Sequence, residues 1–160
     1  MPRNDGEASA PRTASPSASA PGFALYVSPG LSYSFQYPAG WTLLPLGHDG
    51  SHYTQDLVSE NTASPENLSA SGIWLNIQVD TQPTQACVIS PTTDPSVTTR
   101  EVVLDGSTST EHVSSRGIEG PYVLHGGWCY KIGFITLSAA AVQQHTGDVE
   151  RIYSSFRFNR

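Results

Sequence analysis

Two short segments constrain the fold of this 160-residue chain more than any other part of it. In the first, residues 33–37 alternate aromatic and polar side chains, and Pro38 then interrupts the pattern. Alternation with a period of two is typical of a β-strand that buries one face, and proline ends such a strand. In the second, residues 148–156 carry apolar side chains every three or four positions and lead into Phe158. This spacing predicts a short amphipathic helix followed by an aromatic strand.

Further strands follow from the same alternation of apolar and polar side chains. Residues 31–37 and 41–46 are both extended in character, and the turn formers at 38–40 between them predict a hairpin. A weaker third strand is predicted at 53–58. The clearest alternation in the chain places Ile73, Leu75, Ile77 and Val79 on one face, opposite Trp74, Asn76, Gln78 and Asp80.

The second half of the chain contains a predicted hairpin and a predicted central strand. Residues 98–104 and 107–113 flank Asp105-Gly106, a pair that is typical of a two-residue hairpin turn. Residues 128–137 are apolar on both faces, which predicts a strand in the middle of a sheet that is covered on both sides.

Helix is scarce in the predicted fold. Residues 139–145 can start one helix, and residues 147–155 form a stronger one, with Thr146 as its predicted cap. Asp148 and Glu150 lie in its first turns, where the helix dipole favours negative charge. Its apolar stripe should lie on the sheet and consists of Val149, Ile152, Tyr153 and Phe156. The predicted fold class is therefore α+β, with a mainly antiparallel β-sheet flanked by few helices.

Residues 1–22 differ in composition from the rest of the chain. They are rich in Ala, Ser and Pro and contain no aromatic side chain. Such a segment cannot offset an ordering cost of roughly 1–2 kcal/mol per residue, so we predict a disordered linker over 1–22 and one domain over 23–160. One interpretation is the tether of an exported bacterial lipoprotein whose signal sequence and lipid-bearing cysteine preceded residue 1. The alternative is an ordinary disordered N-terminus. No stretch is long and apolar enough to span a membrane.

The two cysteines, Cys87 and Cys129, favour the exported compartment. Neither belongs to a Cys-x-x-Cys pair, and no histidine lies at ligand spacing beside them, so they do not form a metal motif. A disulfide between them would stabilise the fold by roughly 4 kcal/mol in the chain-entropy model. The alternative is two buried free thiols in a reducing compartment.

The net charge of −6 excludes one class of partner. Binding through phosphates requires concentrated basic side chains, but Lys131 is the only lysine, beside seven arginines. The sequence therefore predicts no nucleic-acid partner and disfavours anionic membrane surfaces.

Few residues are candidates for chemistry. His48, Asp49 and His52 lie close together and could hold a divalent transition metal, although a solvated turn is the alternative. Glu111-His112 on a Ser/Thr-rich strand is interpreted as surface rather than as a general-base pair. No phosphate-binding, dinucleotide-binding or nucleophile motif occurs, and no cofactor is predicted.

Trp74 is the candidate for ligand binding, because it shares the polar face of its strand with Asn76 and Gln78. An aromatic ring beside amides suits the stacking of a sugar or a peptide. The alternative is a packing role, which is also the interpretation for Trp41 and Trp128.

The two ends of the domain resemble the PsbP-like family. This family includes photosystem-associated PsbP proteins, Ran-binding Mog proteins and bacterial secreted lipoproteins. The resemblance rests on the Tyr-Pro-x-x-Trp pattern at 37–41 and the Ser-Phe-x-Phe pattern at 155–158. It implies an antiparallel sheet flanked by helices in an α/β/α sandwich. Pro83, Pro91 and Pro95 interrupt any long helix before the strand at 98–104, so one covering helix is not expected here.

The resemblance and the absence of catalytic motifs favour a non-enzymatic extracytoplasmic binding or assembly module, because members of the family dock on protein partners. Such a module would bind a protein partner or a small ligand. The alternative is a secreted hydrolase whose active site is assembled from distant residues. A pocket with two or more carboxylates, or a Ser–His contact, would favour the hydrolase. An aromatic and polar patch around Trp74 would favour binding.

Overall fold

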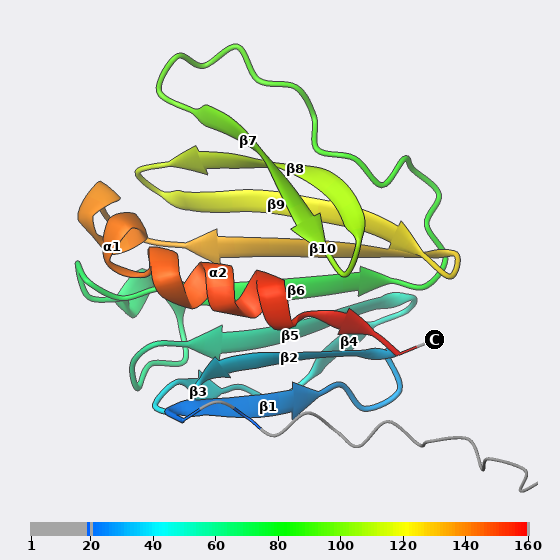
Figure 1. The fold of residues 1–160 in the computed structure, drawn as a ribbon, viewed down its shortest axis with the longest axis horizontal. Coiled ribbons are helices and arrows are strands. Elements are labelled where there is room, and N and C mark those ends of the chain that lie inside the picture. The colour runs from blue at the N-terminus through cyan, green and yellow to red at the C-terminus, as the bar shows by residue number, and fades with distance from the viewer. Residues whose placement is uncertain (1–18, 20, 160) are drawn as a thin grey trace, which may run out of the picture.

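The computed structural model describes residue 19 and residues 21–159. Within this part the chain forms two antiparallel sheets and two short α-helices, which confirms the mainly antiparallel fold predicted from the sequence (Figure 1). Residues 1–18 and 20 of the predicted linker lie outside the described residues, so their disorder stays a prediction. No helix in the described part is long and apolar enough to cross a membrane.

The large sheet runs in the order β3-β5-β6-β10-β9-β8-β7, and β4 pairs with β5. Its strands are β3 (Thr42–Leu43), β4 (Gly47–Asp49), β5 (His52–Val58), β6 (Trp74–Asp80), β7 (Thr98–Leu104), β8 (Ser107–Ser114), β9 (Gly117–His125) and β10 (Trp128–Ile135). β10 lies between β6 and β9, as predicted for a central strand. Its second face is only partly covered, because Ile135 is 38% exposed, so the prediction of cover on both faces is wrong at this end.

The strongest sequence patterns correspond to strands of this sheet. The apolar side chains of β6 alternate into the core and are buried. β7 and β8 form the predicted hairpin, with φ angles of 47° at Asp105 and 80° at Gly106. Both central residues of this turn have positive φ, which is the conformation that matches the twist of paired strands.

β9 is a strand that the pattern analysis does not predict. The pair Gly120-Pro121 in its middle interrupts the alternation of side chains, since neither residue is favoured in a strand. The pairing of β9 with β10 shifts register at this point, between Lys131 and Gly133. A bulge of this kind breaks the period-two alternation from which strands are predicted, so the sequence pattern does not indicate β9.

The small sheet joins β1 (Phe23–Val27), β2 (Tyr33–Pro38) and β11 (Arg157–Phe158), in the order β1-β2-β11. The predicted hairpin between residues 31–37 and 41–46 is therefore wrong. After the turn at Pro38, Trp41 is buried against His145, and the following residues pair with β5 of the large sheet. Alternation identifies a strand but does not identify its partner.

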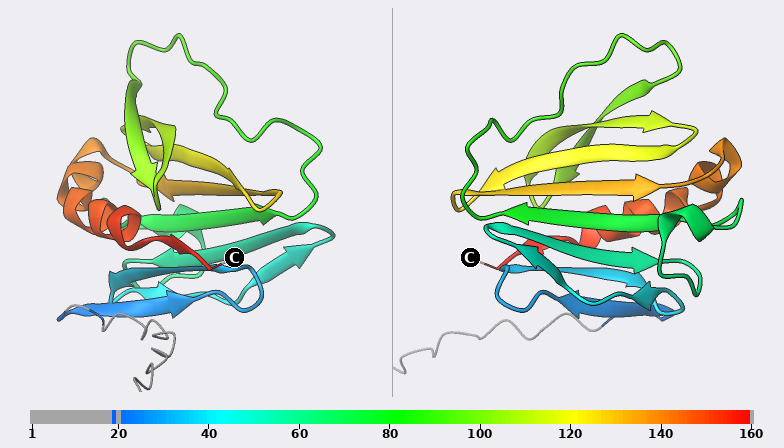
Figure 2. Two further views of the ribbon diagram at one scale, coloured as in Figure 1. Left: turned by 45° about the vertical axis from the view of Figure 1, so that its right-hand side comes forward. Right: turned by 180° about the vertical axis from the view of Figure 1, so that it is seen from behind.

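Helix α1 (Ala139–Gln144) and helix α2 (Thr146–Ser155) lie over the same face of the large sheet (Figure 2). The predicted stripe on α2 is confirmed, because its four apolar side chains are buried. The predicted cap is wrong, since Thr146 is already helical and its hydroxyl donates to the Val142 carbonyl at 3.1 Å. His145, the single residue between α1 and α2, occupies the N-cap position instead, without a side-chain capping hydrogen bond. The described residues place no α-helix on the opposite face, so the second helical layer of an α/β/α sandwich is not present among them.

Aromatic side chains join the two sheets and α2 in one core. Phe156, at the end of α2, stacks on Tyr33 and Phe35 of β2 with ring centroids 5.4 and 6.0 Å away. All three side chains are 0% exposed. Burial of such large rings is the main source of stabilisation in a core of this kind. The two terminal motifs therefore meet in space.

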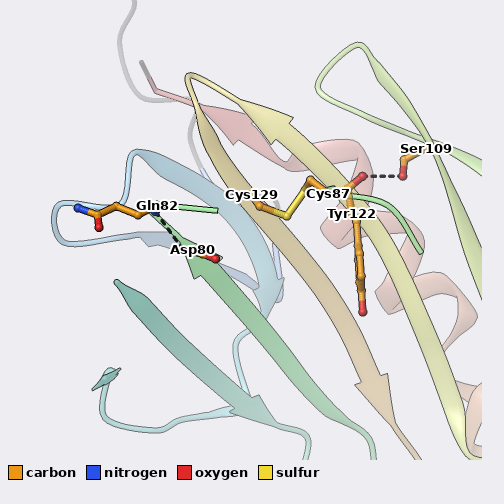
Figure 3. The surroundings of a disulfide bond; sticks show 6 residues. All are labelled: Asp80, Gln82, Cys87, Ser109, Tyr122 and Cys129. Atoms are coloured by element: carbon orange, nitrogen blue, oxygen red, sulfur yellow. Dashed lines mark hydrogen bonds between the residues drawn. A yellow bond between two sulfur atoms is a disulfide. The ribbon is translucent and has the colours of Figure 1, made fainter. Parts of the chain in front are cut away.

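A long connection, residues 81–97, leads from β6 to β7 and passes over the face of the large sheet opposite the helices (Figure 2). We call this segment the strap. Cys87 of the strap bonds to Cys129 of β10, with 2.02 Å between the sulfur atoms and 5.6 Å between the Cα atoms (Figure 3). The predicted disulfide is confirmed, and it attaches the strap to the middle of the sheet.

Candidate binding groove

The open face of the large sheet carries polar side chains from four neighbouring strands. Cross-strand pairing places Asn76 of β6, Gly133 of β10, Glu119 of β9 and His112 of β8 in one row across the sheet. Successive residues of a strand point to opposite faces, so this row lies away from the helices. Gly133 has no side chain, and it therefore leaves a hollow in the middle of the row.

Two adjoining cavities lie between this face and the strap. Their volumes are about 540 and 650 Å³, and Pro91, Thr92, His112 and Tyr122 line both. Together we call them the groove. Volumes of this size match those of sites for small ligands. The charged, amide, histidine and tyrosine side chains that line the 540 Å³ cavity are Asn76, Gln78, His112, Arg116, Glu119, Tyr122 and Lys131.

Hydrogen bonds hold the amide side chains of β6 in fixed orientations. Asn76 Nδ2 donates to Asp56 Oδ1 at 2.6 Å, and Gln78 Nε2 donates to Asn76 Oδ1 at 2.9 Å. These contacts use one hydrogen of each amide, and both side chains line the groove. Fixed donors and acceptors of this kind provide orientation and specificity to a ligand site.

Tyr122 connects a cation and a carboxylate in the groove. The Lys131 ammonium lies 5.4 Å from the centre of the Tyr122 ring, and the Tyr122 hydroxyl donates to Glu119 Oε1 at 3.1 Å. Burial and then the Glu119 carboxylate raise the pKa of Tyr122 to about 12. The phenol therefore stays protonated near neutral pH and acts as a hydrogen-bond donor.

Of the predicted ligand-binding residues, Asn76 and Gln78 line the groove, but Trp74 does not. Trp74 is 4% exposed and packs against Val58 and Leu68, while its indole nitrogen donates to Asp56 at 2.9 Å. Its ring is covered by the connection between β5 and β6, so it presents no stacking surface. The aromatic ring of the groove is instead Tyr122, from the strand that the sequence patterns missed.

The candidate metal residues lie on the hairpin of β4 and β5. His48 pairs with Tyr53 across the hairpin, and the two rings are 4.6 Å apart. His52, one position before Tyr53, points to the other face and lies 3.7 Å from Asp80. The structure therefore pairs Asp49 with His52 across the hairpin but places His48 on the opposite face. No group of three or more metal-ligating side chains occurs within the described residues.

A contact between Ser51 and His52 also lies at this hairpin. The Ser51 hydroxyl lies 3.2 Å from His52 Nδ1 and donates to Asp80 Oδ1 at 3.2 Å. In a catalytic triad, the two ring nitrogens of histidine contact serine and aspartate separately. Here the same nitrogen faces both groups, so the ring cannot transfer a proton between them. The contact does not form a hydrolase site.

A third cavity lies on the helix side of the sheet, between α2 and the β7–β8 hairpin. Its volume is about 210 Å³, and its charged lining residues are Arg100, Glu101, Glu111 and Glu150. Glu111 is 3% exposed, so its interpretation as a surface residue is wrong. His112, the next residue, points to the groove on the other face.

Glu111 is held by two partners beneath α2. Its Oε2 accepts from the Tyr153 hydroxyl at 2.8 Å, and its Oε1 lies 3.3 Å from Arg100 Nε. Burial raises the pKa of Glu111, and the Tyr153 hydrogen bond and the Arg100 charge oppose this shift. Both carboxylate oxygens are thus occupied by side chains of the fold.

No protein-family model and no curated protein matches this chain. The resemblance to the PsbP-like family therefore rests on the two terminal motifs, and the site is interpreted from its own geometry.

Proposed function

We propose that the protein is a non-enzymatic extracytoplasmic binding module that holds a small polar ligand in the groove. The observation that carries the proposal is the groove itself. It combines ligand-sized volume with side chains that hydrogen bonds and a cation–π contact already hold in place. Preorganised polar groups lower the ordering cost of binding.

The disulfide supports an extracytoplasmic location. Disulfides persist in oxidising compartments and are rare in the cytosol. Cys87 and Cys129 attach the strap at the groove, so their bond also keeps one wall of the binding site in place. In this proposal, residues 1–22 tether the domain to a membrane surface.

The proposed fold relationship is to PsbP-like domains. It is supported by the contact of the second motif with the strand that leads into the first, since Phe156 stacks on Tyr33 and Phe35 of β2. Members of that family act by docking on partners, which agrees with a binding role and with a groove as the place of contact.

A secreted hydrolase is the second candidate, and the carboxylates of the cavity beneath α2 favour it. The arrangement around Glu111 speaks against it. The carboxylate is bound by Tyr153 and Arg100, and the cavity is less than half the volume of either part of the groove. A catalytic acid must reach the substrate atom that it protonates.

The proposal is tested by following backbone amide NMR signals while a panel of neutral and acidic saccharides, amino acids and short peptides is added. Binding in the groove should shift the amides of residues 76–78 and 131–133. The variant Gly133→Val fills the hollow, where an added Cβ meets only the Ile118 carbonyl oxygen at 3.4 Å. It should abolish the shifts, and a thermal melt should show that the variant is folded.

Gly40→Val is the matched control, because no atom lies within 4 Å of an added Cβ at that turn. It should bind as the parent protein does. The binding proposal fails if no panel member shifts the groove amides, or if Gly133→Val binds normally. The hydrolase candidate gains support instead if a panel member is cleaved and Glu111→Gln stops the cleavage.

A further inference from the structure

The groove differs in charge from the rest of the molecule. The chain carries a net charge of −6, yet its only lysine, Lys131, and Arg116 both line the groove, against Glu119 as the single carboxylate there. Neither cation has a carboxylate within ion-pair distance in the described part of the chain. Cations without a carboxylate partner, gathered in a cavity of an acidic protein, fit an anionic ligand.

The two cations lie at different points along the groove. Lys131 is next to Tyr122 across the β9–β10 ladder, whereas Arg116 directly precedes Gly117, which pairs with Ile135. Ile135 lies four positions after Lys131 on β10, so their Cα atoms are about 13 Å apart. The two cations therefore extend from different points along the groove, and a ligand with negative charge at more than one position, such as an oligosaccharide with more than one acidic sugar, can contact both.

The remaining lining fits a carbohydrate better than a peptide. The floor of the groove is the face of a sheet whose backbone groups are bonded to neighbouring strands, so an extended peptide finds no main-chain partners there. A sugar is bound by side chains alone. The amides of Asn76 and Gln78 can bind hydroxyl groups, and the Tyr122 ring can pack against the C–H face of a sugar.

From these observations we infer that the groove binds an acidic carbohydrate, a short oligosaccharide with carboxylate groups on successive sugars. This inference rests on the proposed binding function and adds the chemical class of the ligand. Lys131 and Arg116 bind the carboxylates, and the amides of β6 bind the hydroxyls between them.

Isothermal titration calorimetry with trigalacturonate tests the inference, and its methyl ester serves as a neutral ligand of the same length. The acid should bind, and the ester should bind at least tenfold more weakly. Affinity for the acid should fall as salt is raised from about 0.05 to 0.5 M, because partly exposed charges are screened. Lys131→Met keeps the aliphatic stem and removes the charge, and Arg116→Gln keeps a hydrogen-bond donor. Each should weaken binding about tenfold, the loss of one charge-assisted contact.

Arg157→Gln is the control, because this exposed arginine lies on β11, near Asp105 and outside the groove. It should leave affinity unchanged, and thermal melts should show all three variants folded. Equal binding of acid and ester, or equal losses for Arg157→Gln and Lys131→Met, would overturn the inference. If neutral saccharides shift the groove amides and trigalacturonate does not, the charge assignment falls while the binding function stands. If no ligand of any kind shifts them, both fall.

Discussion

Two groups of interacting side chains with the same residue types lie on opposite faces of the large sheet. Beneath α2, Tyr153 donates to Glu111, which pairs with Arg100. In the groove, Tyr122 donates to Glu119, and Lys131 lies over the Tyr122 ring. Each group combines a tyrosine, a glutamate and a cation, but only the first is covered by a helix.

The difference between the two groups is one of burial, and it determines what each can do. On the covered face the three side chains satisfy one another, and burial holds the pKa of Tyr153 well above its usual value. On the open face the cation has no carboxylate partner and can bind something else. The same residue types are thus structural on one face and available for a ligand on the other. Four predictions test this contrast.

The largest effect is expected in the aromatic core of the covered face. Phe156→Ala should lower the free energy of unfolding by about 3–5 kcal/mol, because it removes a fully buried ring from a stack of three. Ile135→Ala on the open face should cost no more than about 1 kcal/mol, since that side chain is 38% exposed. Urea unfolding measures both. Equal losses would mean that the two faces contribute alike.

Removal of the disulfide should come next. The double variant Cys87→Ala, Cys129→Ala should lose about 2–4 kcal/mol of stability, because the bond closes a loop of 42 residues in the unfolded chain. Unfolding of the parent protein with and without a reducing agent provides an independent comparison. If the strap is a wall of the groove, the same variant should also bind groove ligands more weakly. Unchanged stability and affinity would argue against any role for this attachment.

The two tyrosines permit a matched comparison. Tyr153→Phe removes the donor to buried Glu111 and should cost about 1–3 kcal/mol, the penalty for an unsatisfied buried acceptor. Tyr122→Phe should cost less than about 0.5 kcal/mol, since water can replace its hydroxyl at the exposed Glu119. Thermal and chemical unfolding at neutral pH give both values. A reversed order would break the contrast between the faces.

The smallest effect concerns the pH dependence of stability. Burial raises the pKa of Glu111 in the folded state above its ordinary value of 4.5, so the folded protein holds this proton more tightly than the unfolded chain does. Its contribution to stability is present below pH 4.5 and is lost as pH rises through the folded-state pKa. Glu111→Gln cannot titrate, so its stability should fall less steeply than that of the parent above pH 4.5. Parallel pH profiles would contradict the burial argument.

Much of the fold follows from local patterns in the sequence. Three predicted features depend only on residues close together in the sequence, and all three are present in the structure. They are the alternation at β6, the Asp105-Gly106 turn and the apolar stripe of α2. The sequence patterns do not predict β1. They do not predict β9 either, because the bulge at Gly120 interrupts its alternation. The partners of β2 were also not predictable, because register and pairing depend on residues far away in the chain.

The groove could be predicted only in part. Asn76 and Gln78 were identified because they occupy the polar face of a clear strand. Tyr122 and His112 reach the same groove through pairings that no local pattern specifies. Trp74 lies on the same face as the amides, yet Leu68 and the connection before β6 cover it. Alternation identifies the face of a side chain but not the loop that covers that face.

The pairing of β2 with β11 has a consequence for the order of synthesis. Ser34 pairs with Arg157, and the Asn159 amide donates to the Ser32 carbonyl at 2.8 Å. At about 5–20 residues per second, a ribosome makes β11 on the order of ten seconds after β2. The aromatic side chains of β2 lack Phe156 throughout that interval, so the core cannot close on the growing chain. The packing of β2 in this core is therefore complete only after residue 158 has emerged.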